Sequence, residues 1–149
     1  MEKISVGGFV MKGKKILLVQ RAQEPGKGKW TIPGDFVEQT ETINRVIQRE
    51  IKEKTGINAQ VQKIFSIGEL PSVKEHDVYI VFRLTYLSGK IQLQKDEIMV
   101  ADFFSIEDAL KLPLANLTQQ LLALFQEKSG GLVARNNVPE DANGFYLYG

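Results

Sequence analysis

The sequence predicts a single domain of the α+β class, or a sandwich built on a mixed sheet. The length of 149 residues suits one domain with one sizeable core. Short apolar runs typical of strands predominate, with one helix expected early in the chain and one expected late. This order lacks the regular strand–helix alternation of a doubly wound parallel sheet. No repeat, low-complexity tract or linker divides residues 1–149, so we expect one domain over the whole chain.

The composition excludes several classes of protein. Apolar residues make up 43% of the chain and charged residues 25%, as in ordinary globular proteins. The absence of cysteine excludes a disulfide framework, a thiolate nucleophile and a zinc–thiolate site. A net charge of +1 without a long basic run gives no support to a nucleic-acid partner. No apolar run reaches about 18 residues and no signal peptide is recognisable, so we expect a cytoplasmic protein without a membrane partner.

The first part of the chain has the pattern of short strands and exposed loops. Val6–Met11 and Ile16–Gln20 are apolar runs, and residues 12–15 between them have the composition of a hairpin turn. Residues 23–29 contain the Gly, Pro and Lys typical of an exposed loop. Residues 30–37 are expected to be a short extended piece, interrupted by a Pro-Gly pair.

The second part of the chain continues the strand pattern. Strands are expected over residues 59–70 and 77–87, because the latter, DVYIVFRLTYL, is rich in β-branched and aromatic residues. A further strand is expected over residues 98–104.

Two late helices are expected after these strands. Ser105-Ile106-Glu107-Asp108 resembles a capping box, which predicts a short helix ending near Pro113. Another helix is predicted over residues 116–128, with Gly130 as its stop. The side chains expected on one face of this helix are Leu117, Leu121, Leu124 and Phe125. Residues 131–149 receive no assignment.

Residues 43–55 are expected to form the early helix, with Thr42 as its N-cap, and their pattern puts charged groups on the inner face. At about 100° per residue, an apolar stripe is formed by Ile43, Val46, Ile47 and Ile51. Glu50 and Lys54 project into this stripe, while Arg49 and Glu53 lie along its edge. Inward charges are costly unless they are paired or bound to metal. Two interpretations are therefore open, a ladder of i,i+4 ion pairs and a metal–phosphate site.

The segment Gly34–Ile57, GDFVEQTETINRVIQREIKEKTGI, resembles the signature box of the Nudix (MutT-like) hydrolases. The family pattern is G-x5-E-x7-R-E-U-x-E-E-x-G-U, with U aliphatic, and here Glu41 lies eight residues before the Arg-Glu pair. The preceding WTIPG resembles the K-W-x-x-P-G-G approach to the box, and ADFFSIED at 101–108 resembles the family's W-F-x-x-E-E-L segment. The resemblance extends from about Ser5 to Phe125. It implies an α/β/α sandwich around a mixed β-sheet.

The resemblance also implies a metal site. Family members typically use Mg²⁺ to hydrolyse nucleoside diphosphates linked to another group, and Mn²⁺ is an alternative ion. Glu50 and Glu53 match the metal-binding glutamates, and either is a candidate for the base that activates water. The carbonyl of Gly34 and the carboxylate of Glu97 would complete the coordination, with Asp96 as the second choice to Glu97.

Other site residues follow from the same resemblance. Arg49 would act with the catalytic glutamates by orienting them through charge-assisted hydrogen bonds. Glu41 would support the helix N-terminus or reach an outer-shell water. The residues expected to bind substrate are Arg21, Lys29, Glu38 and Lys54. Arg21 and Lys29 lie near the expected mouth of the cleft, where they would guide an anionic substrate.

Two positions depart from the family pattern. Asp35 stands where the pattern has its first Gly, and Lys54 stands where it has its last Glu. Because an ammonium cannot ligate Mg²⁺ and pairs readily with Glu50, three outcomes are open: weak hydrolysis with fewer metal ions, hydrolysis with Lys54 on the phosphate, or binding without catalysis.

The function expected from the sequence is Mg²⁺-dependent hydrolysis of a phosphoanhydride bond in a nucleoside diphosphate derivative. ADP-ribose-like or dinucleotide substrates are favoured. The alternative is a catalytically silent module that senses a nucleotide. A third possibility is a structural or interaction protein in which the early helix serves only packing, with a homodimer formed through the late Leu-rich helix or the tail.

Overall fold

A computed structural model of the protein describes residues 2–38, 40–71, 74–94, 96–127 and 146–148. The elements, in chain order, are β1 (Glu2–Lys12), β2 (Lys15–Arg21), β3 (Trp30–Thr31), β4 (Gly34–Phe36), α1 (Ile43–Thr55), β5 (Asn58–Pro71), β6 (His76–Ser88), β7 (Ile98–Ser105), α2 (Ile106–Ala109), α3 (Asn116–Gln126) and β8 (Tyr146–Tyr148). The predicted strands and the early helix are confirmed, with bounds that differ by a few residues at most strand ends.

The described strands join one mixed sheet. Its main path runs β3-β2-β1-β6-β5-β8, with β4 paired to β1 and β7 paired to β2. β1 runs parallel to β6, from Glu2 opposite His76 to Met11 opposite Thr85, whereas the other strand pairs of the described residues are antiparallel. The predicted hairpin joins β1 to β2, and its turn contains Gly13 at a φ of 61°, a conformation that glycine adopts without steric cost.

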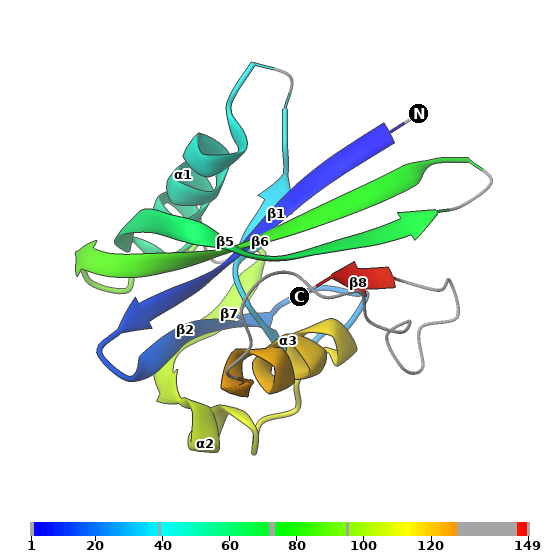
Figure 1. The fold of residues 1–149 in the computed structure, drawn as a ribbon. Coiled ribbons are helices and arrows are strands. Elements are labelled where there is room, and N and C mark those ends of the chain that lie inside the picture. Colours follow the sequence, from blue (N-terminus) through cyan, green and yellow to red (C-terminus); the bar gives the residue numbers. More distant parts are fainter. Residues whose placement is uncertain (1, 39, 72–73, 95, 128–145, 149) are drawn as a thin grey trace.

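Helices cover both faces of this sheet, with α1 on one side and α2 and α3 on the other (Figure 1). A core cluster between α1 and the sheet includes Val6, Val10, Leu17, Val46, Ile47 and Ile51. A second cluster, under α2 and α3, includes Phe9, Ile16, Leu18, Ala109, Leu121 and Leu122. Neighbouring strand residues enter opposite clusters because successive side chains of a strand point to opposite faces. The predicted α/β/α sandwich around a mixed β-sheet is confirmed.

The bounds of α1 follow from its local sequence. The helix covers the predicted residues, and its buried apolar side chains are Val46, Ile47 and Ile51. Gly56 ends it with a φ of 80°, and the Gly56 N–H donates to the carbonyl of Lys52 at 2.9 Å, a left-handed C-cap that favours glycine. Thr42 occupies the predicted N-cap position, but its hydroxyl donates to Asn44 Oδ1 at 2.6 Å and caps no backbone N–H.

The late helices differ from the prediction in detail. Ser105 Oγ accepts from the N–H of Asp108 at 3.1 Å, as the capping box predicts. α2 nevertheless ends at Ala109 instead of near Pro113, because the next residues form a turn with i→i+3 bonds. In α3, Leu122 is fully buried although the sequence did not single it out. Gly130 and most of residues 131–149 lie outside the described residues.

The described part of the C-terminal tail is β8. This strand lies antiparallel to β5 at the edge of the sheet, with Leu147 opposite Gly68. Among the described residues, no helix has the length and apolar character that crossing a membrane requires.

Candidate functional site

The candidate site lies where β4, α1 and the segment before β7 meet. Gly34 opens β4 and pairs with Gly7 of β1. A Cβ atom at position 34 would collide with the carbonyl oxygen of Val6, so this close approach of two backbones requires glycine. The approach also brings the Gly34 carbonyl within reach of α1.

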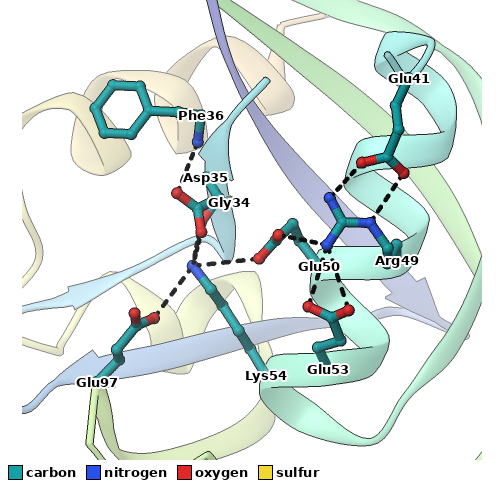
Figure 2. Close-up of polar contacts among 9 residues, drawn as sticks. All are labelled: Gly34, Asp35, Phe36, Glu41, Arg49, Glu50, Glu53, Lys54 and Glu97. Carbon is teal, nitrogen blue, oxygen red and sulfur yellow. Dashed lines mark hydrogen bonds and ion pairs between the residues drawn. The ribbon is translucent and has the colours of Figure 1, made fainter. Parts of the chain in front are cut away.

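The Lys54 ammonium lies at the centre of the site (Figure 2). Its side chain is only 11% exposed. The oxygen atoms around Nζ are the carbonyl oxygen of Gly34 (2.7 Å), Asp35 Oδ2 (3.1 Å), Glu97 Oε2 (3.3 Å) and Glu50 Oε2 (3.7 Å). The predicted i,i+4 pair with Glu50 is therefore present, but it is the longest of these contacts. Since the other oxygens come from β4 and from the segment before β7, the tertiary fold creates this cluster.

The two departures from the Nudix pattern contact each other. The carboxylate of Asp35 meets the ammonium of Lys54 at 3.1 Å, and its other oxygen accepts from the N–H of Phe36 at 2.7 Å. Burial would raise the pKa of Asp35, but the Phe36 N–H and the Lys54 ammonium together hold it below the usual value. The sequence did not reveal this pair. Two departures of opposite charge within one motif were the signal that could have found it.

Arg49 holds the glutamates of the box together (Figure 2). Its Nε and Nη2 donate to the two carboxylate oxygens of Glu41 at 2.9 and 2.6 Å. Its Nη1 donates to Glu50 Oε1 at 2.9 Å and to Glu53 Oε2 at 3.2 Å. Two-pronged, charge-assisted contacts of this kind fix geometry as well as adding energy. Arg49 thus contacts both Glu50 and Glu53, and its i,i+4 pair with Glu53 is part of this network.

Glu41 makes a contact that the sequence did not predict. It was expected to support the helix N-terminus or to reach an outer-shell water, whereas its carboxylate binds the guanidinium of Arg49. The hydrogen bond from Arg49 lowers the pKa of Glu41, and the same contact raises the pKa of Arg49.

Glu50 lies between two cations. Its Oε1 accepts from Arg49 and its Oε2 faces Lys54, and only 11% of its side chain is exposed. Burial raises the pKa of Glu50, and the nearby charge of Asp35 raises it further. The carboxylate is therefore a better proton acceptor than an ordinary glutamate. Glu53 differs, because its side chain is 55% exposed.

A cavity of about 400 Å³ opens beside Lys54, within the ~300–1,000 Å³ usual for small-molecule sites. The polar residues that line it include Arg21, Gly34, Asp35, Lys54 and Glu97. Its apolar and aromatic lining includes Val19, Ile32, Phe36, Tyr79 and Ile98. Of the residues expected at the site, the structure brings Arg21, Gly34, Lys54 and Glu97 to this cavity.

Other expected residues lie outside the lining of this cavity. Lys29 and Glu38 are exposed and do not contribute to it, so the structure does not support their predicted contact with substrate there. The backbone of Lys29 is fixed in a turn by bonds to Arg21 and Gly26, and Glu38 follows the end of β4. Glu50 and Glu53 lie behind Lys54, against Arg49, and are also absent from the lining.

The oxygen atoms of the site divide into two groups with respect to a divalent cation. The inner oxygen set consists of the Gly34 carbonyl, the Asp35 and Glu97 carboxylates and Glu50 Oε2. The outer pair consists of Glu50 Oε1 and the Glu53 carboxylate. Mg²⁺ prefers such hard oxygen ligands, and it often takes one or two carboxylates and completes its shell with water and phosphate. Both groups of the outer pair accept from Arg49 Nη1, at 2.9 and 3.2 Å, so a metal ion could bind there only in place of these contacts.

The inner oxygen set does not fit a metal ion, because the Lys54 ammonium lies at its centre. In the part of the chain that the structure describes, no group of at least three His, Cys, Asp or Glu side chains is placed to hold a metal ion.

Comparison with known proteins gives relatives over most of the chain. The ADP-ribose pyrophosphatase of Methanocaldococcus jannaschii is 35% identical over 111 residues, which are 73% of this chain and 65% of that protein. The NAD-capped RNA hydrolase NudC of Haemophilus influenzae is 36% identical over 103 residues, 68% of this chain and 38% of that protein. The ADPR responsive transcriptional repressor NtrR of Acinetobacter baylyi is 32% identical over 125 residues, 77% of this chain and 49% of that protein. The chain thus spans less than two thirds of the length of each.

The fold is shared with solved structures and the family model covers most of the chain. The crystal structure of a MutT NUDIX hydrolase from Burkholderia pseudomallei superposes with a TM-score of 0.73 at 26% identity, covering 83% of this chain and 98% of that one. The model of the NUDIX domain family matches residues 1–125. On this match and the shared sandwich fold, the chain belongs to the NUDIX domain family.

Proposed function

We propose that the protein hydrolyses a phosphoanhydride bond in a nucleoside diphosphate linked to another group, releasing a nucleoside monophosphate. ADP-ribose-like and dinucleotide substrates are favoured, since one relative is named as an ADP-ribose pyrophosphatase and another as a hydrolase of NAD-capped RNA. The observation that carries the proposal is the position of the Arg49 network behind a cation-bearing cavity. Glu50 links the two, with one carboxylate oxygen on Arg49 and the other facing Lys54.

The cavity has groups suited to a diphosphate and to a base. The charged residues of its wall are Arg21, Lys54, Glu24, Asp35 and Glu97. Arg21 and Lys54 are the proposed contacts for the diphosphate, because their positive charges attract its phosphate oxygens. Phe36 also lines the cavity and is 57% exposed. A nucleobase stacked on such a ring gains about 1–3 kcal/mol, so Phe36 is the proposed contact for the base.

The chain's own carboxylates would activate the attacking water. Glu50 and Glu53 are both candidates for the base: burial raises the pKa of Glu50, and Glu53 is the more exposed of the two. General-base catalysis contributes about 10²–10⁴-fold to a rate. Arg49 positions both groups through its Nη1. By resemblance to the family, Glu50 and Glu53 would hold Mg²⁺, or Mn²⁺ instead, in place of their contacts with Arg49 Nη1. Such an ion would stabilise charge on the phosphoryl oxygens.

A release assay tests the proposed function. The purified protein is incubated with ADP-ribose, dinucleotides and nucleoside triphosphates, with Mg²⁺, with Mn²⁺ and with chelator, and nucleoside monophosphate is quantified. Release that depends on substrate class and disappears in a folded Glu50→Gln, Glu53→Gln double variant supports it. A folded protein that releases nothing from any substrate contradicts it.

A nucleotide-binding sensor is the second candidate function. Lys54 favours it, because an ammonium cannot ligate a metal ion, and so does the relative named as an ADPR responsive repressor. Thermal stabilisation by ADP-ribose without any turnover would select this function over hydrolysis. The cytoplasmic location, the lack of a nucleic-acid partner and the homodimer stay predictions.

A further inference from the structure

We propose that the Lys54 ammonium is a built-in cation that occupies the position of a divalent metal ion in the inner oxygen set. A metal ion could then bind only at the outer pair, in place of the contacts that Arg49 Nη1 makes there. The inference itself concerns cation binding and is tested without turnover. Only its consequence, hydrolysis with one metal ion fewer, rests on the proposed function.

The first support is the set of atoms that surround Nζ. Carboxylates of Asp35, Glu50 and Glu97 and the carbonyl of Gly34 point at one position from three segments of the chain (Figure 2). Such oxygens are the ligands that a hard divalent cation takes. Carboxylates gathered in this way repel one another unless a cation lies between them. The ammonium of Lys54 supplies that charge from within the chain.

The second support is the fixed position of this ammonium. The Lys54 side chain is 11% exposed, and its Nζ donates to the Gly34 carbonyl at 2.7 Å. A Mg²⁺ ion bound to the same oxygens would lie about 2.0–2.1 Å from each of them. The metal ion and the ammonium therefore cannot share the position.

The third support comes from Asp35. This residue is the other departure from the family pattern, and it reaches the ammonium from β4 at 3.1 Å. The chain thus has one carboxylate and one cation that the family pattern lacks, and the two contact each other. The pair matches a site arranged around an ammonium better than it matches a metal site that has lost one ligand.

The consequence concerns the substrate. Lys54 lines the cavity, so its charge faces the space where the diphosphate would bind. An ammonium is a compact point charge that can contact phosphate oxygens directly. Lys54 would therefore offset part of the phosphate charge that a metal ion offsets in a site of the family pattern.

A metal-binding measurement tests this inference with Lys54→Gln and the matched control Lys52→Gln. Lys52 is exposed on the same helix, and among the described residues its side chain bonds only to the Gly56 carbonyl. The control therefore removes the same positive charge at a place outside the inner oxygen set. Calorimetry with MnCl₂ or MgCl₂ should give one more bound ion per chain for Lys54→Gln than for the unmodified protein and the control. The metal ion should also raise the melting temperature of Lys54→Gln more than it raises that of the unmodified protein or of Lys52→Gln. Equal stoichiometry in all three proteins would overturn the inference.

A second measurement needs no variant at the site and applies even if Lys54→Gln fails to fold. Lysine Nζ signals of the ¹⁵N-labelled unmodified protein are followed by NMR during a MgCl₂ titration. The buried Lys54 ammonium should remain visible and in slow exchange at saturating Mg²⁺. Its displacement by Mg²⁺ would show that the metal takes the inner oxygen set and would refute the inference.

These readouts separate the two proposals. The predicted cation behaviour without nucleotide turnover rejects the proposed function and keeps the role of Lys54. Nucleotide turnover together with a metal ion in the inner oxygen set of the unmodified protein would keep the proposed function and reject this role of Lys54.

Discussion

Replacing Lys54 by methionine should destabilise the protein even before any ligand is added. Methionine fills the space of the buried stem but removes the ammonium. Removing one partner of a buried ion pair costs about 3–5 kcal/mol. The lower end applies here, because Glu50 keeps its contact with Arg49 at 2.9 Å. Asp35 and Glu97, with side chains 36% and 51% exposed, regain hydration when the ammonium is lost.

We therefore expect a loss of about 3 kcal/mol in the free energy of unfolding. For a chain of this size, each kcal/mol corresponds to about 2–4 °C, so the melting temperature should fall by about 6–12 °C. The assay is urea and thermal unfolding followed by circular dichroism, in chelator, with Lys52→Met as the control. The Lys52→Met substitution at this exposed position should change the free energy of unfolding by no more than about 0.5 kcal/mol.

The reasoning fails if a folded Lys54→Met protein unfolds within about 1 kcal/mol of the unmodified protein. Such a result would mean that the surrounding carboxylates do not depend on the ammonium, and that its contacts in the structure contribute little.

Three further predictions concern single positions. Lys54→Glu should tighten divalent-ion binding in calorimetry, because it removes the competing cation and adds a hard oxygen ligand; unchanged affinity in a folded variant would mean that position 54 does not face the site. Gly34→Ala should cost about 1–3 kcal/mol or more in urea unfolding, because its Cβ would meet the carbonyl oxygen of Val6; unfolding at the normal midpoint would show that the strands separate freely. Arg49 lowers the pKa of Glu41 below 4.5, so the extra stability of the unmodified protein over Glu41→Gln should be full above pH 4.5 and should shrink as the pH falls through the lowered pKa. Urea unfolding over a pH series measures this difference in the free energy of unfolding. A difference that grows as the pH falls would contradict a lowered pKa of Glu41.

Local patterns predicted most of the fold. The bounds of α1 followed from an apolar stripe with helical period and from Gly56, and the structure places both ends at the predicted residues. The hairpin between β1 and β2 followed from two apolar runs around Gly13. Leu122 was missed because helical spacing alone does not tell how wide a face the second core cluster covers. The C-terminal β8 was missed because a short strand at a sheet edge has a weak pattern of its own.

The site was predicted where its contacts are local or lie in the family motif. The i,i+4 spacing connected Arg49 with Glu53, and the family resemblance connected it with Glu50. The cluster around Lys54 depends on β4 lying against β1, and it joins Lys54 to Gly34, 20 positions away, and to Glu97 in the segment before β7. Helix periodicity cannot give such contacts. The family resemblance suggested Lys29 and Glu38 for the cleft, whereas the direction of each side chain depends on the turn or strand end that carries it.

The central claim is that the carboxylates of α1 carry out hydrolysis of a nucleoside diphosphate derivative. Its most direct test is the single-turnover rate of ADP-ribose cleavage with Mg²⁺ by the unmodified protein, by Glu53→Gln and by Glu107→Gln, an exposed control on α2. We predict a loss of about 10²–10⁴-fold for Glu53→Gln at an unchanged melting temperature, with the control at the unmodified rate. A folded Glu53→Gln protein that cleaves at the unmodified rate would contradict the assignment of the site.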